Sequence, residues 1–401
     1  MVKIKPKLLL VLSIAVLLTA IATVQALVLP LKTFEAGGIL YTEYNNYIIF
    51  KQSFFHLIHN QDLYQLFPKE QWDLFKYSPT FALLMGLLAY FTNWVGLFIW
   101  NLLNSAILII SIWKLPFKND AKRLYAITFI VIELVTSIQN SQSNGLIAGM
   151  IIFAFLAIEH EKIWLASLLI VGTVFIKLFG VVALGLFFLY PGKFKAALYT
   201  ILWFVILGLL PLIVITPQQL VILYKSWGQL LKNDQLINYG LSVMGWLFTW
   251  FNLIVNKSYV VILGAIVFCM PFLRFGYFRE MRFRLLYLSS VLIWVIIFNH
   301  RAESPTFIIA AVGIAIWYFS KNEVKLIDRV LLLFAFVFTI LSATDIFPTA
   351  VKRHFLEPYV MKAMPCIFIW FKILWEQMFY PSEKGLTKPD RSYDLNLQEG
   401  R

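Results

Sequence analysis

Apolar segments follow one another along most of the 401-residue chain, separated by short polar stretches. A helix that crosses the hydrocarbon core of a membrane needs about 20 mostly apolar residues. The first segment of that length covers residues 8–29. The later apolar segments cover residues 80–91, 95–113, 122–138, 144–159, 163–177, 178–190, 196–216, 241–256, 258–273, 285–299, 304–319, 326–343 and 358–376. This pattern predicts an all-α polytopic membrane protein.

Basic residues indicate how the helices alternate across the membrane. Lys and Arg gather in short loops at Lys114–Arg123, Lys193–Lys195, Arg274–Arg284 and Lys321–Arg329. Short basic loops usually face the cytosol. If all of them do so together with the N-terminus, the short segments 80–91 and 241–256 are re-entrant or interfacial pieces. About 12 helices then cross the membrane, and both termini are cytosolic.

The first loop, residues 30–79, is long, polar and rich in aromatic residues. Loops of this length without structure of their own usually have a function. From Tyr44 to Ile58 the loop has the spacing of an amphipathic helix, whose apolar face is formed by Tyr47, Phe50, Phe54 and Leu57. Such a helix is expected to lie along the membrane interface rather than to cross it.

Composition supports the membrane assignment. Charged residues make up 14% of the chain, against about 25% in soluble domains. The net charge of +13 follows from the basic loops, so nucleic-acid binding is not expected. Cys269 and Cys366 lie in apolar segments, where buried thiols rather than a disulfide framework are expected. We expect one membrane domain over residues 1–378 and a polar cytosolic tail over residues 379–401.

The polar clusters of the chain fall on one side of this predicted topology. They are the 30–79 loop, Gln139–Asn144, Lys177, the 217–242 loop and Asn299–Glu303. In the predicted topology all of them are extracytoplasmic, whereas the cytosolic loops are short and basic. A functional site is therefore expected on the extracytoplasmic side.

Two of these clusters offer amides and a single cation. The run from Gln139 to Asn144, which includes Gln142, either only joins two helices or presents amides to a hydroxyl-rich ligand such as a sugar. Lys177 stands alone between two apolar segments. It either anchors its helix at the interface or binds an anion such as phosphate.

Charged residues at the predicted membrane edge are further candidates. His300, Arg301 and Glu303 form either a phosphate site or a structural ion pair, because a guanidinium matches phosphate and carboxylate oxygens equally well. Lys76 is either an interface anchor or an anion ligand.

Three carboxylates compete for the role of a general base. Glu43 follows the first apolar segment, and Glu35 and Asp62 lie in the same loop. Each is either a base that accepts a proton from a hydroxyl group or a solvated loop residue. The chain has no P-loop, no GxGxxG and no HExxH motif, so an extracytoplasmic enzyme of this kind needs an activated substrate held in the membrane itself.

The order of the motifs along residues 1–310 resembles glycosyltransferase family 87, whose mannosyltransferase-like members belong to the GT-C superfamily and depend on polyprenyl phosphate. The motifs are Glu43 after the first helix, Asp62-Leu-Tyr64, Tyr77-Ser-Pro79, Trp100-Asn-Leu-Leu-Asn104, Gln142-Ser-Asn144, Lys177, Gly240-Leu-Ser242 and His300–Pro305. The resemblance implies a GT-C-like helical bundle with a long first outer loop that carries interfacial helices.

The resemblance also implies a reaction. A hexose, such as mannose, moves with inversion from a polyprenyl-phosphate donor to a lipid or glycan acceptor, without a metal or other cofactor, at a bacterial cytoplasmic membrane. Glu43 matches the family's catalytic acidic residue, which is usually Asp, and would be the base. The residues that would bind the substrate or its phosphate are Lys76, Tyr77, Gln142, Asn144, Lys177, Ser242, His300, Arg301 and Glu303.

Two other classes of function remain open. A transporter or lipid flippase often has internal repeats and a polar site at the membrane midplane, whereas the polar residues here lie at one edge. A non-catalytic partner in the assembly of an envelope glycan would tolerate the replacement of Glu43.

Overall fold

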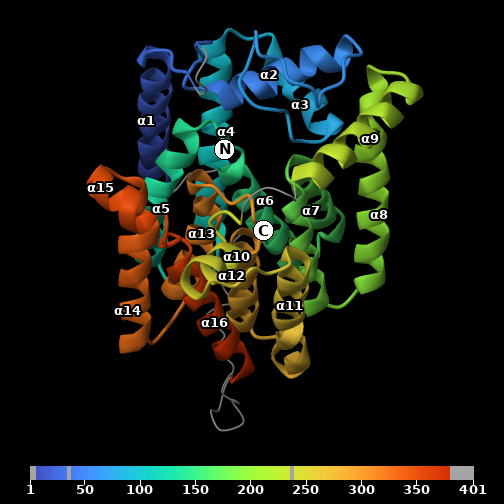
Figure 1. Ribbon diagram of the computed structural model, residues 1–401. Coiled ribbons are helices and arrows are strands. Elements are labelled where there is room, and N and C mark those ends of the chain that lie inside the picture. Colours follow the sequence, from blue (N-terminus) through green and yellow to red (C-terminus); the bar gives the residue numbers. More distant parts are fainter. Residues whose placement is uncertain (1–5, 34–37, 235–238, 380–401) are drawn as a thin grey trace.

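The computed structural model describes residues 6–33, 38–234 and 239–379, which fold into helices (Figure 1). In chain order these are α1 (Pro6–Val28), α2 (Asn45–Ile58), α3 (Pro79–Ala89), α4 (Asn93–Lys114), α5 (Asp120–Gln139), α6 (Asn144–Glu159), α7 (Ile163–Ile176), η1 (Leu178–Leu189), α8 (Lys193–Leu209), η2 (Leu210–Ile213), α9 (Pro217–Asp234), α10 (Val243–Phe251), α11 (Lys257–Cys269), η3 (Met270–Tyr277), α12 (Met281–Ile297), η4 (Ser304–Phe307), α13 (Ile308–Phe319), α14 (Leu326–Ala335), η5 (Phe336–Ile340), η6 (Leu341–Ala343), α15 (Thr349–Val351), η7 (Lys352–Leu356) and α16 (Met364–Met378). The described part of the chain contains no strand, as the all-α prediction requires. The predicted tail, 379–401, and Glu35 lie outside the described residues, apart from Phe379.

Several helices are long and apolar enough to cross a membrane. Among the described residues, five helical segments have this length and composition, namely Pro6–Val28, Asn93–Lys114, Lys193–Ile213, Lys257–Tyr277 and Leu326–Ala343. In the third and fourth of these segments only 11% and 17% of the residues of an 18-residue apolar stretch are buried inside the protein. Apolar residues that the protein itself leaves uncovered are expected to face hydrocarbon. The chain is therefore a helical membrane protein, and the number of about 12 spans stays a prediction.

The core lies around α12 and α13, whose side chains are almost all buried. These two helices pack on each other, and α5, α6 and α16 surround them. On one flank α1 packs on α4 and α5, and on the other α8 packs on α7 (Figure 1). Small residues allow some of these close approaches: a side chain at Gly313 of α13 would meet the backbone of Ser289 in α12.

Local signals explain where several helices begin. Ser78 is the N-cap of α3, since its Oγ accepts the backbone N–H of Phe81 at 3.1 Å, and Pro79 occupies the first helical position. Asn119 caps α5 in the same way, with its Oδ1 3.0 Å from the backbone nitrogen of Lys122. These caps fix helix starts that the apolar pattern alone leaves uncertain by a few residues.

Two expectations from the sequence are wrong. The segment 217–242 was expected to be a loop, but most of it forms α9, an amphipathic helix that starts at Pro217. Its low overall hydropathy hides a helical spacing of apolar residues, with Leu220 and Leu223 buried and Val221 exposed. Cys269 was expected to be buried, but it is exposed on a helix whose surface is mostly uncovered, while Cys366 is buried as expected.

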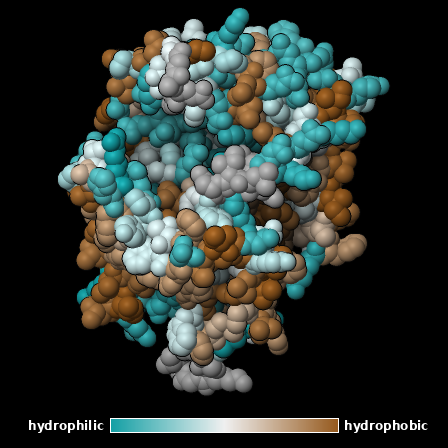
Figure 2. Space-filling view, in the orientation of Figure 1, coloured by the Kyte–Doolittle hydropathy of each residue, from teal (hydrophilic) through white to brown (hydrophobic). Residues whose placement is uncertain are grey.

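The molecule has two chemically different ends. At the end that we call the polar end lie α2, α3 and the start of α9, at the top of Figure 1. The amphipathic helix predicted between Tyr44 and Ile58 is α2, and the four residues of its predicted apolar face are buried. Figure 2 shows hydrophilic residues around a hollow in the upper part of this face and more apolar surface below.

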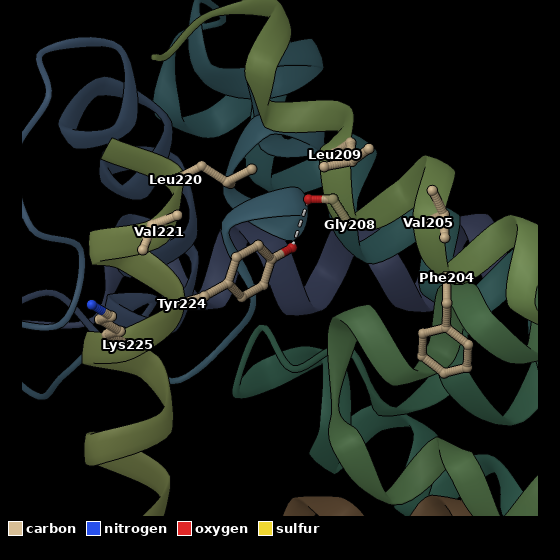
Figure 3. Close-up of a pocket in the computed structure, with 8 residues that line it drawn as sticks. All are labelled: Phe204, Val205, Gly208, Leu209, Leu220, Val221, Tyr224 and Lys225. Atoms are coloured by element: carbon tan, nitrogen blue, oxygen red, sulfur yellow. Dashed lines mark hydrogen bonds between the residues drawn. The ribbon is translucent and has the colours of Figure 1, made fainter. Parts of the chain in front are cut away.

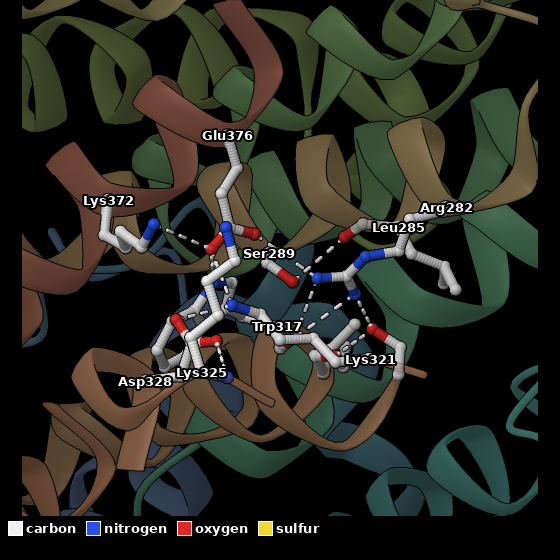
Figure 4. Close-up of polar contacts among 11 residues, drawn as sticks. Arg282, Leu285, Ser289, Trp317, Lys321, Lys325, Asp328, Lys372 and Glu376 are labelled. Atoms are coloured by element: carbon white, nitrogen blue, oxygen red, sulfur yellow. Dashed lines mark hydrogen bonds and ion pairs between the residues drawn. The ribbon is translucent and has the colours of Figure 1, made fainter. Parts of the chain in front are cut away.

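The opposite end, which we call the basic end, holds an ion network. Lys321 Nζ lies 2.6 Å from Glu376 Oε1 and 2.8 Å from Asp328 Oδ1. Arg282 and Lys372 also approach Glu376, each at 3.5 Å (Figure 4). We call these five residues the basic-end ion network. It joins the ends of α12, α13, α14 and α16.

Candidate active site

The candidate site is centred on Lys177, at the point of the polar end where α7 gives way to η1. The Lys177 Nζ donates to Asn144 Oδ1 at 2.9 Å and to Gln142 Oε1 at 3.1 Å. It also lies 5.8 Å from the centre of the Tyr77 ring. Within the described chain no carboxylate forms an ion pair with this half-buried ammonium, and Glu303 acts on it only at longer range. Uncharged oxygens therefore hold a cation whose charge is left uncompensated.

A hydrogen bond of the neighbouring residue, Ser78, holds Tyr77 close to this position. The hydroxyl of Ser78 donates to the backbone oxygen of Phe175 at 2.5 Å, two residues before Lys177. The start of α3 and the end of α7 are thus fastened together, although 97 positions separate the bonded residues. Burial raises the pKa of the Tyr77 phenol above its ordinary value. The phenol therefore stays protonated at neutral pH and can donate a hydrogen bond.

The hairpin that carries Gln142 and Asn144 is held from α4 and α2. The indole Nε1 of Trp100 donates to the backbone oxygen of Ser141 at 2.9 Å. Asn104 Oδ1 accepts the backbone N–H of Leu146 at 2.9 Å, at the start of α6. The side chain of Asn46 donates to the backbone oxygen of Asn140 at 2.9 Å. A plain connection between two helices does not require these anchors, which fix the amides in place.

The loop after α12 reaches the same cluster. Asn144 Nδ2 donates to the backbone oxygen of Pro305 at 2.9 Å. Gly240, at φ +56°, lies directly against the backbone oxygen of His300, so any side chain there would displace the loop. The structure thus brings the 299–305 loop beside Asn144, with the Glu303 carboxylate exposed and within electrostatic range of Tyr77. His300 and Arg301 have interactions of their own within the protein.

Glu43 lies just before α2 and forms an ion pair with Lys32. Its Oε2 is 2.5 Å from Lys32 Nζ, and both side chains are partly exposed. The residues that follow it are fixed, because Asn45 bonds the backbone of Trp72 from both its amide atoms. Glu43 is three positions from Asn46, whose side chain bonds the Gln142 hairpin. The predicted base is therefore close in the chain to the cluster, without a direct contact to it in the structure.

Other predicted residues have structural partners. Lys76 pairs with Asp73 at 2.9 Å. Ser242 caps α10 by accepting the backbone N–H of Gly245, and its hydroxyl donates to the backbone oxygen of Tyr239. Asp62, the alternative base, accepts from Ser226 at 2.9 Å and so ties the first loop to α9.

Similarity to a known protein family is the decisive observation. The model of glycosyltransferase family 87 matches residues 75–299. The chain belongs to this family. In this family-87 chain the matched region begins two residues before Tyr77 and ends at Asn299, and it includes Lys177 with its partners Gln142 and Asn144. Glu43 and Glu303 lie outside it. Among curated proteins no match was found.

The family-87 chain also has an apolar cavity of ≈ 580 Å³ between α8 and α9. It is lined by Phe204, Val205, Gly208, Leu209, Leu220, Val221, Tyr224 and Lys225 (Figure 3). Tyr224 reaches across from α9, and its hydroxyl donates to the backbone oxygen of Gly208 at 3.0 Å.

The cavity adjoins the polar cluster on two sides. The Phe204 ring lies 6.0 Å, between centroids, from that of Phe175, near the end of α7. On α9, Trp227 packs against Tyr224 and donates to the backbone oxygen of Lys76 at 3.2 Å. The apolar cavity is thus connected to the cationic site through Phe175, two residues before Lys177, and through the backbone of Lys76.

A second charged pair lies in the core, and its residues were not among those predicted from the sequence. Lys362 Nζ lies 2.7 Å from Glu133 Oε1, with side-chain exposures of 6% and 0%. The same ammonium bonds Ser304 Oγ at 2.8 Å, at the start of η4 beside Glu303. The available signal was a pair of opposite charges inside two apolar segments, Glu133 within 122–138 and Lys362 within 358–376, since ionisable residues in membrane segments are rarely unpaired.

Proposed function

We propose that this glycosyltransferase moves a sugar from a polyprenyl-phosphate donor to a hydroxyl group of a lipid or glycan acceptor, with inversion, on the extracytoplasmic side of a bacterial cytoplasmic membrane. The observation that carries the proposal is the uncompensated charge of Lys177 beside an apolar cavity. A ligand that suits both features has an anionic head and a long apolar tail. A polyprenyl phosphate has this chemistry.

The donor phosphate would bind at Lys177. Its negative charge supplies the counter-charge that Gln142 and Asn144 do not. The phenol of Tyr77 adds a hydrogen-bond donor. The cavity of ≈ 580 Å³ is large enough for part of a prenyl chain, and the remainder would lie in the membrane. His300, Arg301 and Lys76 are proposed to attract the phosphate at longer range.

The sugar would lie among the anchored amides. The Nε2 of Gln142 has no hydrogen bond in the described structure, whereas Asn144 Nδ2 is occupied by Pro305. Gln142 can therefore use its oxygen for Lys177 and its nitrogen for a sugar hydroxyl or a phosphate oxygen at the same time. Glu303, which is exposed at the rim, is proposed to accept from the sugar or the acceptor.

In the proposed reaction, Glu43 takes the proton of the acceptor hydroxyl. The acceptor oxygen forms a bond to the anomeric carbon as the bond from that carbon to the phosphate oxygen breaks. The electron pair leaves with the phosphate, and Lys177 stabilises the charge that develops there. Because phosphate leaves as an anion, no general acid is needed, and no metal ion is part of the proposal.

The test is transfer of radiolabelled sugar from polyprenyl phosphate by the purified protein. Glu43→Gln keeps the shape of the side chain but removes the base, so transfer should fall by about a hundredfold or more. The matched control is Glu70→Gln in the same loop, which should leave transfer near that of the wild type. Equal activity of wild type and Glu43→Gln would assign the base to another carboxylate, with Asp62 next. No transfer from any donor, together with saturable lipid binding, would favour a lipid-binding or flippase function instead.

A further inference from the structure

A second cavity, of ≈ 550 Å³, lies at the basic end, on the opposite side from the candidate active site. Its walls come from two turns, the one between η1 and α8 and the one between η3 and α12. Aromatic side chains form much of the lining, namely Phe188, Phe275 and Phe278. Lys193 and Arg279 also line it, and both are exposed.

The depth of this cavity is fixed by the two membrane segments beside it. Lys193 is the first residue of the candidate span Lys193–Ile213, and Tyr277 is the last residue of the span Lys257–Tyr277. Both spans leave most of their apolar surface uncovered. The cavity therefore lies at the level where lipid headgroups meet hydrocarbon, and it opens beside surfaces that face lipid.

A buried ion pair joins the two walls before any ligand binds. Arg284 makes a bidentate contact with Glu159, at 2.7 and 2.9 Å, and Tyr190 also bonds this carboxylate. The other end of the guanidinium donates to the backbone oxygens of Phe278 and Arg279. Glu159 thus compensates the charge of Arg284. Arg284 therefore connects the walls of the cavity and is not expected to attract a ligand.

Two cations remain for an external partner. Within the described chain, neither Lys193 nor Arg279 forms an ion pair. The first turn of α8 adds backbone donors, because its N-cap, Gly192, provides no side-chain acceptor. Unpaired N–H groups at a helix start favour phosphate. The N–H groups at the start of α8 add to the evidence for an anion site, which comes first from the cavity and its two cations.

We propose that this cavity binds one phospholipid with an anionic headgroup, whose phosphate lies between Lys193 and Arg279 and whose acyl chain runs over the three Phe rings. Charge complementarity selects the headgroup, and the aromatic lining together with the membrane depth requires an apolar tail. A soluble phosphate lacks this tail and uses only half of the site. A zwitterionic lipid has the tail but no net negative charge.

Lipid binding to the purified full-length chain tests this proposal. In native mass spectrometry or thermal-shift titrations, phosphatidylglycerol should bind at least tenfold more tightly than phosphatidylcholine with the same acyl chains. Removal of both cations, by Lys193→Gln with Arg279→Gln, should weaken phosphatidylglycerol binding by about thirtyfold, since each basic residue near a membrane surface contributes about fivefold.

Two control variants separate this site from the general charge of the basic end. Lys114→Gln with Lys118→Gln removes the same charge from another loop of that end and should leave the preference unchanged. Lys193→Arg with Arg279→Lys keeps both charges and should keep binding. If the double Gln variant does not fold, Lys193→Gln alone, on an exposed helix start, should still weaken binding by several-fold.

Two results would overturn the proposal. The first is an undiminished preference for phosphatidylglycerol in the Lys193 and Arg279 variants that fold. The second is displacement of the lipid by an equal concentration of inorganic phosphate, which would make this an anion site without a role for the tail.

Discussion

Lys177 at the polar end and Lys321 at the basic end are both lysines at helix ends, but their partners differ in charge. Lys321 lies within 2.8 Å of two carboxylates, from Asp328 and Glu376, and its side chain is only 7% exposed. Lys177 has two amide oxygens as partners and is half-buried. The first cation is neutralised by the protein, whereas the second is positioned but not neutralised. The contrast supports the proposal that Lys177 binds a ligand, whereas Lys321 stabilises the fold.

The largest expected effect is on stability, at the basic end. Lys321→Met leaves the buried Asp328 and the partly buried Glu376 without their main partner, so the free energy of unfolding should fall by about 3–5 kcal/mol. Thermal or denaturant unfolding in detergent measures this change. Lys372→Met is the control, because Lys372 lies 3.5 Å from Glu376 and is more exposed; it should cost about 0.5 kcal/mol or less. Similar stabilities for both variants would contradict the assigned role of Lys321.

The next effect is on activity, at the polar end. Lys177→Met should reduce sugar transfer by about 10²–10³-fold, because the cation proposed to stabilise the departing phosphate is removed. Stability should change far less than for Lys321→Met, since no carboxylate loses its partner. Lys51 is a matched control, as its ammonium is also held by neutral oxygens, from Phe91 and Asn93. An equal loss of transfer in Lys51→Met would show that Lys177 has no special role.

A third variant gives Lys177 a carboxylate partner like those of Lys321. Gln142→Glu places a carboxylate where Lys177 now meets an amide oxygen, and so supplies the missing counter-charge. The melting temperature should rise, while binding of the donor should weaken at least tenfold, because the new carboxylate competes with the phosphate and repels it. Gln142→Leu, which adds no charge, should weaken binding less. A Gln142→Glu variant that binds the donor normally would contradict a phosphate at Lys177.

Some residues of the candidate site could be predicted from the sequence, whereas the contacts between distant segments could not. Lys177, Gln142 and Asn144 were identifiable because local composition marks them, as polar residues that interrupt apolar segments. The bond between Ser78 and Phe175, and the pair of Glu133 with Lys362, join residues 97 and 229 positions apart. Such contacts depend on how the helices pack, which no local pattern encodes. The helix α9 was missed for a different reason, because its apolar spacing is present in the sequence but its overall hydropathy is low.

The smallest expected effect is a dependence of stability on pH, which should occur at the polar end and not at the basic end. At the polar end His56 is buried, bonds Glu70 at 2.8 Å and stacks on Phe67. Burial lowers the pKa of His56, and the bond to Glu70 opposes this shift only in part. The unfolded chain therefore binds a proton more readily than the folded chain. Stability is full above the ordinary histidine pKa of about 6.5 and declines as the pH falls below it.

A comparison of amide hydrogen exchange at pH 7.5 and at pH 5.5 would show which part of the molecule loses stability at the lower pH. Protection should weaken first in α2 and the adjoining loop, and not in the basic-end ion network, which consists of Lys, Arg, Asp and Glu. His56→Gln should remove the difference between the ends. A uniform loss of protection across the molecule would contradict this origin.

The central claim, that the uncompensated charge of Lys177 holds the phosphate of a prenyl lipid, is tested most directly by comparing two ligands that differ only in that phosphate. Binding of a polyprenyl monophosphate and of the corresponding polyprenol would be measured for the wild type and for Lys177→Met. We predict that the wild type prefers the phosphate by at least tenfold and that Lys177→Met binds both ligands about equally, since a hydrogen-bonded charge contributes about 1.5–3 kcal/mol. A preference of the same size in both proteins would contradict the claim.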